Sequence, residues 1–257
     1  MTWQKVFPIS PSNGASLDET SIATMTSIIA ASIDVNRLTA LARKSSLAGE
    51  LQRCGIPPLG KRVAIACDEA FRFVYPTLVD GWRREGAEVV RFSPLANEAP
   101  DPVADSIYLP GGYPELWAGQ LANAENFTAG LRLAASEGKP VYGECGGYMV
   151  LGKDLVDAQG RGHSMAGLLP LSTSFCERRL QLGYLSATLI GSGVLGRAGA
   201  RFRGHEFHYA TIVAERGAAE PLFSVTDAAG RHRDTCGLRR GSVFGSFIHL
   251  IDSCGTT

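Results

Sequence analysis

The chain has 257 residues, 45% hydrophobic and 19% charged, enough to bury the core of one large domain with a smaller appendage. Its 25 Lys and Arg residues balance its 25 Asp and Glu residues, which argues against a nucleic-acid-binding protein. The six cysteines show no CxxC spacing, so we expect reduced thiols rather than a disulfide framework or a zinc knuckle.

Residues 1–60 differ in composition from the rest and predict an N-terminal segment followed by a linker. They are rich in Ser and Thr. Two weak helices are expected over residues 17–33 and 34–44, the second capped by Asp34. Residues 55–60 (GIPPLG) have the Pro and Gly content of a linker.

Apolar runs are too short for a transmembrane helix. The mildly apolar residues 20–33 lack a basic region before them, which argues against a signal peptide. We therefore expect a cytoplasmic protein that binds neither membrane nor nucleic acid.

Residues 61–257 predict an α/β domain with a mostly parallel central sheet flanked by helices. The continuous apolar run at 62–67 is typical of a strand covered on both faces. The further elements expected in chain order are a helix at 73–85, strands at 88–92 and 106–109, a helix at 115–136 with a break near Gly119, and a strand at 140–142. Beyond residue 160, glycine-punctuated segments predict added antiparallel hairpins at 161–169, 180–190, 200–212 and 237–250.

Cys145 lies in the sequence VYGECGGY, between a predicted strand and a predicted helix. Glycines at positions 143, 146 and 147 permit a tight turn with unusual backbone angles. A nucleophile at such a strand–turn–helix elbow is known from hydrolases. We expect the N–H groups at the start of the helix to lower the pKa of the thiol. The alternative is a small buried residue in a glycine-rich turn.

A cysteine nucleophile needs a base, and His249 lies in a late strand-like run that could return to the sheet beside Cys145. A thiolate–imidazolium pair would activate the sulfur. Gly111 and Gly112, after the strand at 106–109, could form an oxyanion hole together with the N–H of Gly146. A core histidine and a plain type II turn remain the alternatives.

The run Gly204–Tyr209 (GHEFHY) is rich in polar and aromatic groups but does not predict a metal site. Its two histidines, His205 and His208, are three apart, whereas the zinc protease motif has them four apart on a helix. An extended backbone would direct them to opposite faces of a sheet. The run is either a substrate-facing cluster or the polar rim of a hairpin.

Four motifs together resemble those of class I glutamine amidotransferases: residues 109–115 (LPGGYPE), 143–148 (GECGGY), 204–209 (GHEFHY) and 245–250 (GSFIHL). More narrowly, the third motif resembles the glutaminase domain of cobyrinic or hydrogenobyrinic acid a,c-diamide synthase, an enzyme of cobalamin biosynthesis. The resemblance covers about residues 60–250 and implies a flavodoxin-like fold.

The resemblance also implies a reaction. Cys145 would attack the side-chain amide of glutamine, His249 would act as base and then as acid, and Gly112 and Gly146 would hold the oxyanion. The ammonia would pass to a synthetase domain that amidates corrinoid carboxylates with ATP and magnesium. Further substrate contacts are expected at Gly111, Tyr113, Glu144, His205, Glu206, His208 and Tyr209.

The chain departs from the pattern in two respects. Many class I enzymes carry Glu two residues after the histidine, where this chain has Ile251, followed by Asp252. The chain also has no G-x-x-x-x-G-K-[ST] phosphate loop. We therefore expect no cofactor or metal within this chain, and ATP and magnesium only in a missing synthetase domain whose tail residues 17–44 resemble. Whether the chain is a fragment or a short gene product stays open.

Two alternative functions remain at this point. One is another class I amidotransferase, acting like cobyric acid synthase or on cell-wall precursors. The other is a non-catalytic ammonia-channel or regulatory subunit. The choice between a homo-oligomer and a complex with a synthetase partner also stays open, as does the presence of cobalt in the corrinoid.

Overall fold

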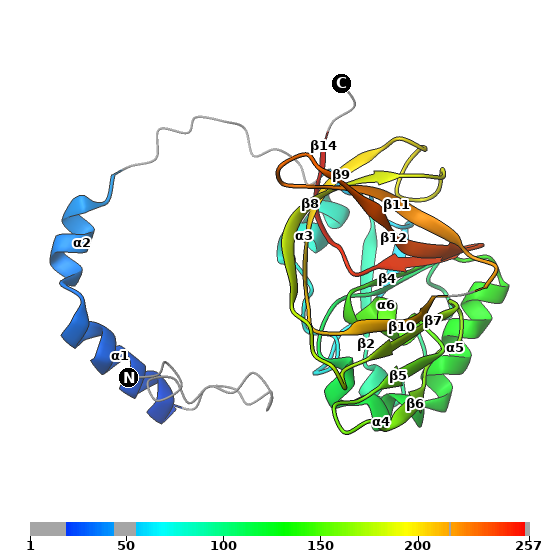
Figure 1. The fold of residues 1–257 in the computed structure, drawn as a ribbon, viewed down its shortest axis with the longest axis horizontal. Coiled ribbons are helices and arrows are strands. Elements are labelled where there is room, and N and C mark those ends of the chain that lie inside the picture. Colours follow the sequence, from blue (N-terminus) through cyan, green and yellow to red (C-terminus); the bar gives the residue numbers. More distant parts are fainter. Residues whose placement is uncertain (1–18, 44–54, 216, 255–257) are drawn as a thin grey trace. The chain divides into compact units, whose positions relative to one another are not determined.

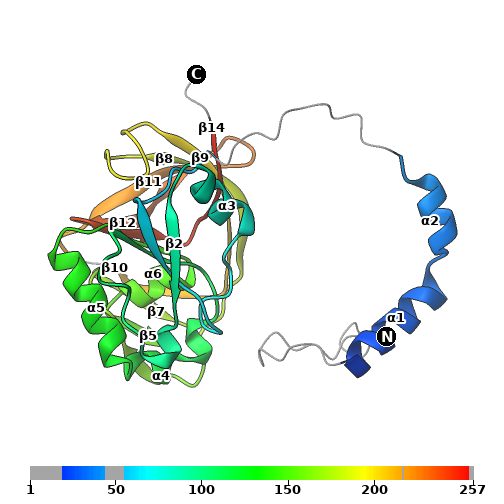
Figure 2. The same cartoon turned by 180° about the vertical axis from the view of Figure 1, so that it is seen from behind.

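The computed structural model describes residues 19–43, 55–215 and 217–254. The chain divides into two units, residues 1–52 and 53–257 (Figures 1 and 2). The predicted N-terminal segment includes residues 1–18 and 44–54, which lie outside the described part, as does the end of the predicted domain at 255–257.

The described part of the first unit, residues 19–43, contains two helices, α1 (Glu19–Ser32) and α2 (Val35–Leu41), close to the predicted positions. Asp34 caps α2 as expected, because its carboxylate accepts the N–H of Arg37 at 2.9 Å. Neither helix buries a residue. No helix in the described ranges is long and apolar enough to cross a membrane.

The segment at residues 55–60 is packed rather than linker-like. Ile56 and Leu59 are each only 2% exposed. The indole N–H of Trp82 donates to the carbonyl of Ile56 at 3.2 Å. Because two apolar side chains alternate with the Pro and Gly residues, the segment closes over one face of the sheet instead of leaving it.

One half of the central ten-stranded sheet is parallel, as predicted. Its strand order is β13-β4-β3-β1-β2, and each pair of neighbours runs in the same direction. These strands are β1 (Arg62–Ala66), β2 (Glu88–Phe92), β3 (Ser106–Leu109), β4 (Val141–Glu144) and β13 (Val243–Ser246).

The other half of this sheet is antiparallel, in the order β14-β9-β8-β11-β12, and joins the parallel half through β12 and β13. Its strands are β8 (Gln181–Leu189), β9 (Arg201–His208), β11 (Glu220–Asp227), β12 (His232–Arg240) and β14 (His249–Cys254). A second sheet, in the order β10-β7-β5-β6, is composed of β5 (Asp154–Val156), β6 (Gly162–Ser164), β7 (Leu171–Ser174) and β10 (Thr211–Glu215). The hairpin character was predicted, but strand β11 and the second sheet were not.

Helices cover both faces of the parallel strands, and Figure 2 shows α3 and α5 on opposite sides. Tyr108 packs against Trp82 of α3 and stacks on Tyr142, whereas Val141 belongs to the other buried cluster, which includes Phe127 of α5. The helical elements of this unit are α3 (Pro76–Arg84), η3 (Pro94–Ala96), η4 (Pro114–Leu116), α4 (Ala118–Ala122), α5 (Glu125–Ser136) and α6 (Gly146–Leu151).

The helix expected at 115–136 is divided into η4, α4 and α5 rather than broken once near Gly119. The side-chain oxygen of Asn97 accepts the N–H of Asn126 at 2.8 Å. This contact satisfies a donor in the first turn of α5, so a new helix begins there.

Candidate active site

Cys145 occupies the predicted elbow between β4 and α6. Its φ of 47° and ψ of −103° lie in a region that residues other than glycine rarely adopt. The N–H of Cys145 donates to the carbonyl of Ser246 on β13 at 2.8 Å. The side chain is 3% exposed. The surrounding fold therefore holds a strained backbone at the end of β4, as is common at functional sites.

Glycine is required on both sides of this elbow. A Cβ on Gly143 would lie 2.7 Å from the carbonyl carbon of Gly147. A Cβ on Gly147 would lie 2.6 Å from the carbonyl carbon of Leu109. The glycines thus allow α6 to pack directly against the ends of β3 and β4.

The turn after β3 lies directly beside the elbow. A Cβ on Gly146 would come within 3.0 Å of the backbone nitrogen of Gly112. The N–H of Gly147 donates to the carbonyl of Pro110 at 3.0 Å, but the N–H of Gly112 has no acceptor within the described residues. The N–H of Gly146 interacts with the Cys145 sulfur. The backbones of Gly112 and Gly146 thus lie close together next to Cys145, and two neighbouring N–H groups are what an oxyanion hole would need.

His249 begins β14, three residues beyond Ser246, whose carbonyl binds the Cys145 N–H. A Cβ on Gly111 would lie 2.5 Å from His249 Cε1, so the ring abuts the same turn as the elbow does. The histidine is 2% exposed. The fold thus gathers Cys145, His249 and the Gly111–Gly112 turn at the carboxyl ends of β3, β4 and β13, where parallel sheets place their ligands.

A second histidine, His205, packs against His249. His205 on β9 is the register partner of His249. Their rings stack at 4.9 Å with an interplanar angle of 16°. The Tyr75 hydroxyl lies 3.1 Å from His205 Nε2. Burial lowers the pKa of His205 and raises that of Tyr75 to about 12, to which the charges of Glu144 and Cys145 also contribute.

The pKa values of Cys145 and His249 differ from those expected from the sequence. Burial raises the pKa of the Cys145 thiol to about 12, and the contact from the Gly146 N–H offsets only part of this effect. Burial, followed by the charges of His205 and His208, lowers the pKa of His249 to about 3. The expectation of a lowered thiol pKa and a resting thiolate–imidazolium pair is therefore wrong, because desolvation outweighs the helix N-terminus. The resting pair is a neutral thiol and a neutral imidazole.

The side chain of Glu144, expected to contact the substrate, is instead buried among protein donors. It is 1% exposed. Its carboxylate accepts the hydroxyls of Tyr108 at 2.7 Å and Tyr142 at 2.8 Å, and the N–H of Leu250 at 3.2 Å. Burial raises the pKa of this carboxyl to about 7. The alternation of Tyr142 and Glu144 along β4 was the available signal that both face the same side of the sheet.

The Gly204–Tyr209 run contributes to two separate places. The burial pattern of β9 puts His205 on one face and His208 on the other, as predicted from an extended backbone. Glu206 and His208 line a cavity of about 390 Å³ together with Arg233. Tyr209 is 45% exposed.

Tyr113 lies at the start of the segment that follows the Gly111–Gly112 turn. Its ring packs against Phe73 with centroids 5.1 Å apart, and Phe73 also donates its N–H to the carbonyl of Gly111 at 2.9 Å. Both aromatic rings therefore border the turn that contacts His249.

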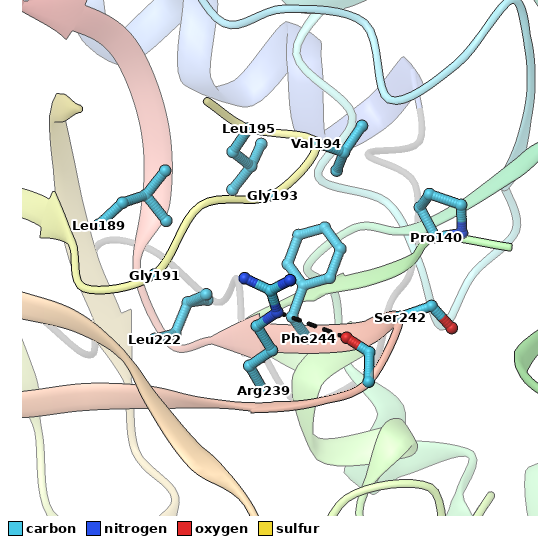
Figure 3. Close-up of a pocket in the computed structure, with 11 residues that line it drawn as sticks. Pro140, Leu189, Gly191, Gly193, Val194, Leu195, Leu222, Arg239, Ser242 and Phe244 are labelled. Carbon is cyan, nitrogen blue, oxygen red and sulfur yellow. Dashed lines mark hydrogen bonds between the residues drawn. The ribbon is translucent and has the colours of Figure 1, made fainter. Parts of the chain in front are cut away.

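A second cavity, of about 210 Å³, lies at the other end of the strands (Figure 3). Pro140 and Ser242 line it, and they precede β4 and β13, whereas Cys145 and His249 follow these strands. The cavity is therefore separate from the candidate active site. Within the described ranges, no group of three or more His, Cys, Asp or Glu side chains could hold a metal ion.

Comparison with known proteins places these observations in a family context. Residues 62–254 match a family described as the CobB/CobQ-like glutamine amidotransferase domain. The hydrogenobyrinate a,c-diamide synthase of Rhizobium meliloti is 58% identical over 206 residues, covering 78% of this chain and 46% of the relative. That of Rhodobacter capsulatus is 51% identical over 233 residues, covering 91% of this chain and 52% of the relative. The chain thus spans about half the length of these curated relatives.

Among solved structures, PurLQS from Thermotoga maritima has a TM-score of 0.50 at 14% identity, covering 73% of this chain and 86% of that chain. This likeness concerns the fold alone. It agrees with the predicted α/β sheet with parallel core strands and antiparallel C-terminal strands.

Proposed function

Because the chain belongs to the family of CobB/CobQ-like glutamine amidotransferase domains, we propose that it is the glutaminase half of a hydrogenobyrinic or cobyrinic acid a,c-diamide synthase. The observation that carries the proposal is the elbow at Cys145. The N–H of Gly112, which has no acceptor in the described part of the chain, the N–H of Gly146 and the buried His249 all lie at the Gly111–Gly112 turn next to Cys145.

In the proposed reaction, the Cys145 sulfur attacks the side-chain amide carbon of glutamine while His249 accepts the thiol proton. The N–H groups of Gly112 and Gly146 bind the oxyanion of the tetrahedral intermediate. His249 then returns the proton to the leaving nitrogen, the C–N bond breaks and ammonia departs. Water, deprotonated by His249, hydrolyses the remaining thioester to glutamate and restores the thiol.

We also propose that several residues around the elbow contact the substrate. Gly111 and Tyr113 belong to the turn beside the sulfur, and His205 stacks on the catalytic ring. The charge of Glu206 contributes to the raised pKa of the Cys145 thiol. The cavity that Glu206 shares with His208 is also lined by Tyr148 of α6, the helix that begins directly after Cys145. We therefore propose both residues as substrate contacts, together with the half-exposed Tyr209, which directly follows β9.

We further propose that the ammonia is used by a synthetase half outside this chain, on the carboxylates of a corrinoid precursor. ATP and magnesium would act there, and glutamine would be the substrate here. A cytoplasmic location is proposed because the reaction needs glutamine and ATP. The described cysteines, Cys67, Cys145, Cys176, Cys236 and Cys254, are all free thiols, which agrees with a reducing compartment.

Covalent labelling tests the proposal. The protein is incubated with 6-diazo-5-oxo-norleucine, an electrophilic glutamine analogue, and analysed by peptide mass spectrometry, in parallel with glutamate release from glutamine. We expect one adduct on Cys145, its loss in Cys145→Ala, and its retention in the matched control Cys176→Ala, which removes an exposed free thiol. A folded protein that gives neither adduct nor glutamate refutes the proposal and favours a non-catalytic subunit.

A further inference from the structure

The catalytic histidine has a buried nitrogen without a hydrogen-bond partner. Within the described residues, His249 Nδ1 has no partner although it is inaccessible to solvent. A histidine that shuttles a proton through one ring nitrogen needs the other nitrogen to be oriented, usually by a carboxylate. This unsatisfied atom therefore calls for an acidic group.

The residues that follow His249 do not supply that group. Ile251, two residues on, is apolar and its side chain is exposed. Asp252 comes next, but its Oδ1 accepts the N–H of Gly55 at 3.3 Å. The carboxylate must therefore come from another element.

Glu144, the residue before the nucleophile, is in the right place. Its Oε2 lies 3.9 Å from His249 Nδ1, and both side chains are almost completely buried. The separation is longer than a hydrogen bond and can shorten when the ring becomes positively charged during the reaction, because catalytic hydrogen bonds often tighten only in the reacting complex.

Three donors hold the Glu144 carboxylate in place. The hydroxyls of Tyr108 and Tyr142 donate to its two oxygens, and the N–H of Leu250 donates to Oε1. Because Leu250 directly follows His249, the same carboxylate anchors the backbone that carries the catalytic ring. This arrangement fixes the ring against a strand that lies far away in sequence.

We propose that Glu144 is the positioning residue of the active site and takes the place of the carboxylate that related enzymes carry two residues after the histidine. It orients Nδ1–H of His249 toward itself, leaves Nε2 free to accept the Cys145 proton, and stabilises the imidazolium that forms. This inference rests on the proposed glutaminase function. It assigns Glu144 a role through His249, not through contact with glutamine.

Five ionisable groups among the described residues lie around Glu144. Tyr108 is on β3, Tyr142 is on β4, His249 is on β14, and Cys145 and Tyr75 flank the site. Burial raises the pKa of Glu144 to about 7, and the two tyrosine hydroxyls act in the opposite direction. Protonation of Glu144 below that pH would remove the negative charge that orients His249.

The test compares kcat and KM for glutamine hydrolysis across pH in Glu144→Gln and in a matched control. Glu144→Gln keeps the size of the side chain and removes its charge. We expect kcat to fall about 10²–10⁴-fold with little change in KM, as when the carboxylate of a catalytic triad becomes an amide. We also expect the acid limb of the kcat profile to move to lower pH or vanish. The control is Asp105→Asn. Asp105 directly precedes β3, and its carboxylate accepts the backbone N–H groups of Lys61 and Arg62. This variant should leave kcat and the acid limb of its pH profile unchanged.

Tyr142→Phe provides a second, opposite readout. It leaves the carboxylate but removes a donor that lowers the pKa of Glu144, so the acid limb should move to higher pH. If Glu144→Gln does not fold, the shift of the acid limb in Tyr142→Phe tests the positioning role instead, and a limb that does not move overturns it. An unchanged kcat in folded Glu144→Gln, or a loss of kcat with an acid limb that does not move, overturns the positioning role. If the unmodified protein neither hydrolyses glutamine nor labels at Cys145, the proposed function itself has failed.

Discussion

Gly111→Ala should impair catalysis in a protein that still folds. A Cβ at this position would lie 2.5 Å from His249 Cε1 and 3.2 Å from Cδ2 of Phe73, whereas ordinary contact begins at 3.4 Å. The histidine ring must therefore retreat by about 0.9 Å. A misplacement of about 1 Å in a catalytic group can lower a rate by about 10²-fold, so we expect kcat for glutamine hydrolysis to fall by that factor.

The assay measures glutamate release and urea denaturation on the same protein. Overpacking of this kind lowers the free energy of unfolding by about 1–3 kcal/mol, so the variant should still fold. Gly162→Ala is the matched control, because nothing lies within 4 Å of its added Cβ. If folded Gly111→Ala keeps kcat within about twofold of the unmodified protein, His249 is not constrained by this turn and the proposed geometry is wrong.

Three further predictions concern the Cys145 thiol, the Asp157 carboxylate between β5 and β6, and Gly147 at the elbow. Burial holds the pKa of Cys145 near 12, so its alkylation without glutamine should rise about tenfold per pH unit through the alkaline range, measured by mass spectrometry against the exposed Cys176. A plateau near neutral pH would contradict this. The ring of His163 on β6 holds the pKa of Asp157 well below its usual range, so the stability that this carboxylate contributes is complete above about pH 4 and is lost gradually as the pH falls from there through the lowered pKa. Asp157→Asn should therefore lower the thermal midpoint at about pH 7, and by progressively less as the pH falls below about 4; a loss that does not shrink between about pH 4 and the acid limit would refute the linkage. Gly147→Ala meets the backbone of β3 and should lower the free energy of unfolding by about 3 kcal/mol or more, which urea denaturation would contradict if the variant matched Gly162→Ala.

The parallel half of the sheet could be predicted because its signals are local. Strands β1, β2 and β3 are short apolar runs, of which β2 and β3 are followed directly by Ser or Pro, and the structure places all three within about a residue of the expected bounds. The elbow at Cys145 was equally local, since glycines on both sides of one cysteine specify the turn. The resemblance added the pairing of this elbow with His249, which lies 104 positions later in the chain.

The antiparallel half depends on pairings between distant segments. Strand β11 lies between β8 and β12, and β14 returns to pair with β9. The run Glu220–Asp227 has a mixed burial pattern with a register shift against β12, so its periodicity is weak. The contact of Leu250 with Glu144 joins residues 106 positions apart. No local pattern reports such a contact, although the alternation of Tyr142 and Glu144 hinted at a shared face.

The failed thiol prediction changes how activation must work. A helix N-terminus acts like about half a positive charge and weakens within a turn, and α6 has only 6 residues. At 3% exposure, Cys145 has lost the water that would stabilise its thiolate. Charge must then appear only as the C–S bond forms, with negative charge on the substrate oxygen and positive charge on His249. In the proposed mechanism, the N–H groups of Gly112 and Gly146 would stabilise the first charge and Glu144 would stabilise the second, so a site without a resting ion pair would still stabilise the transition state at both ends.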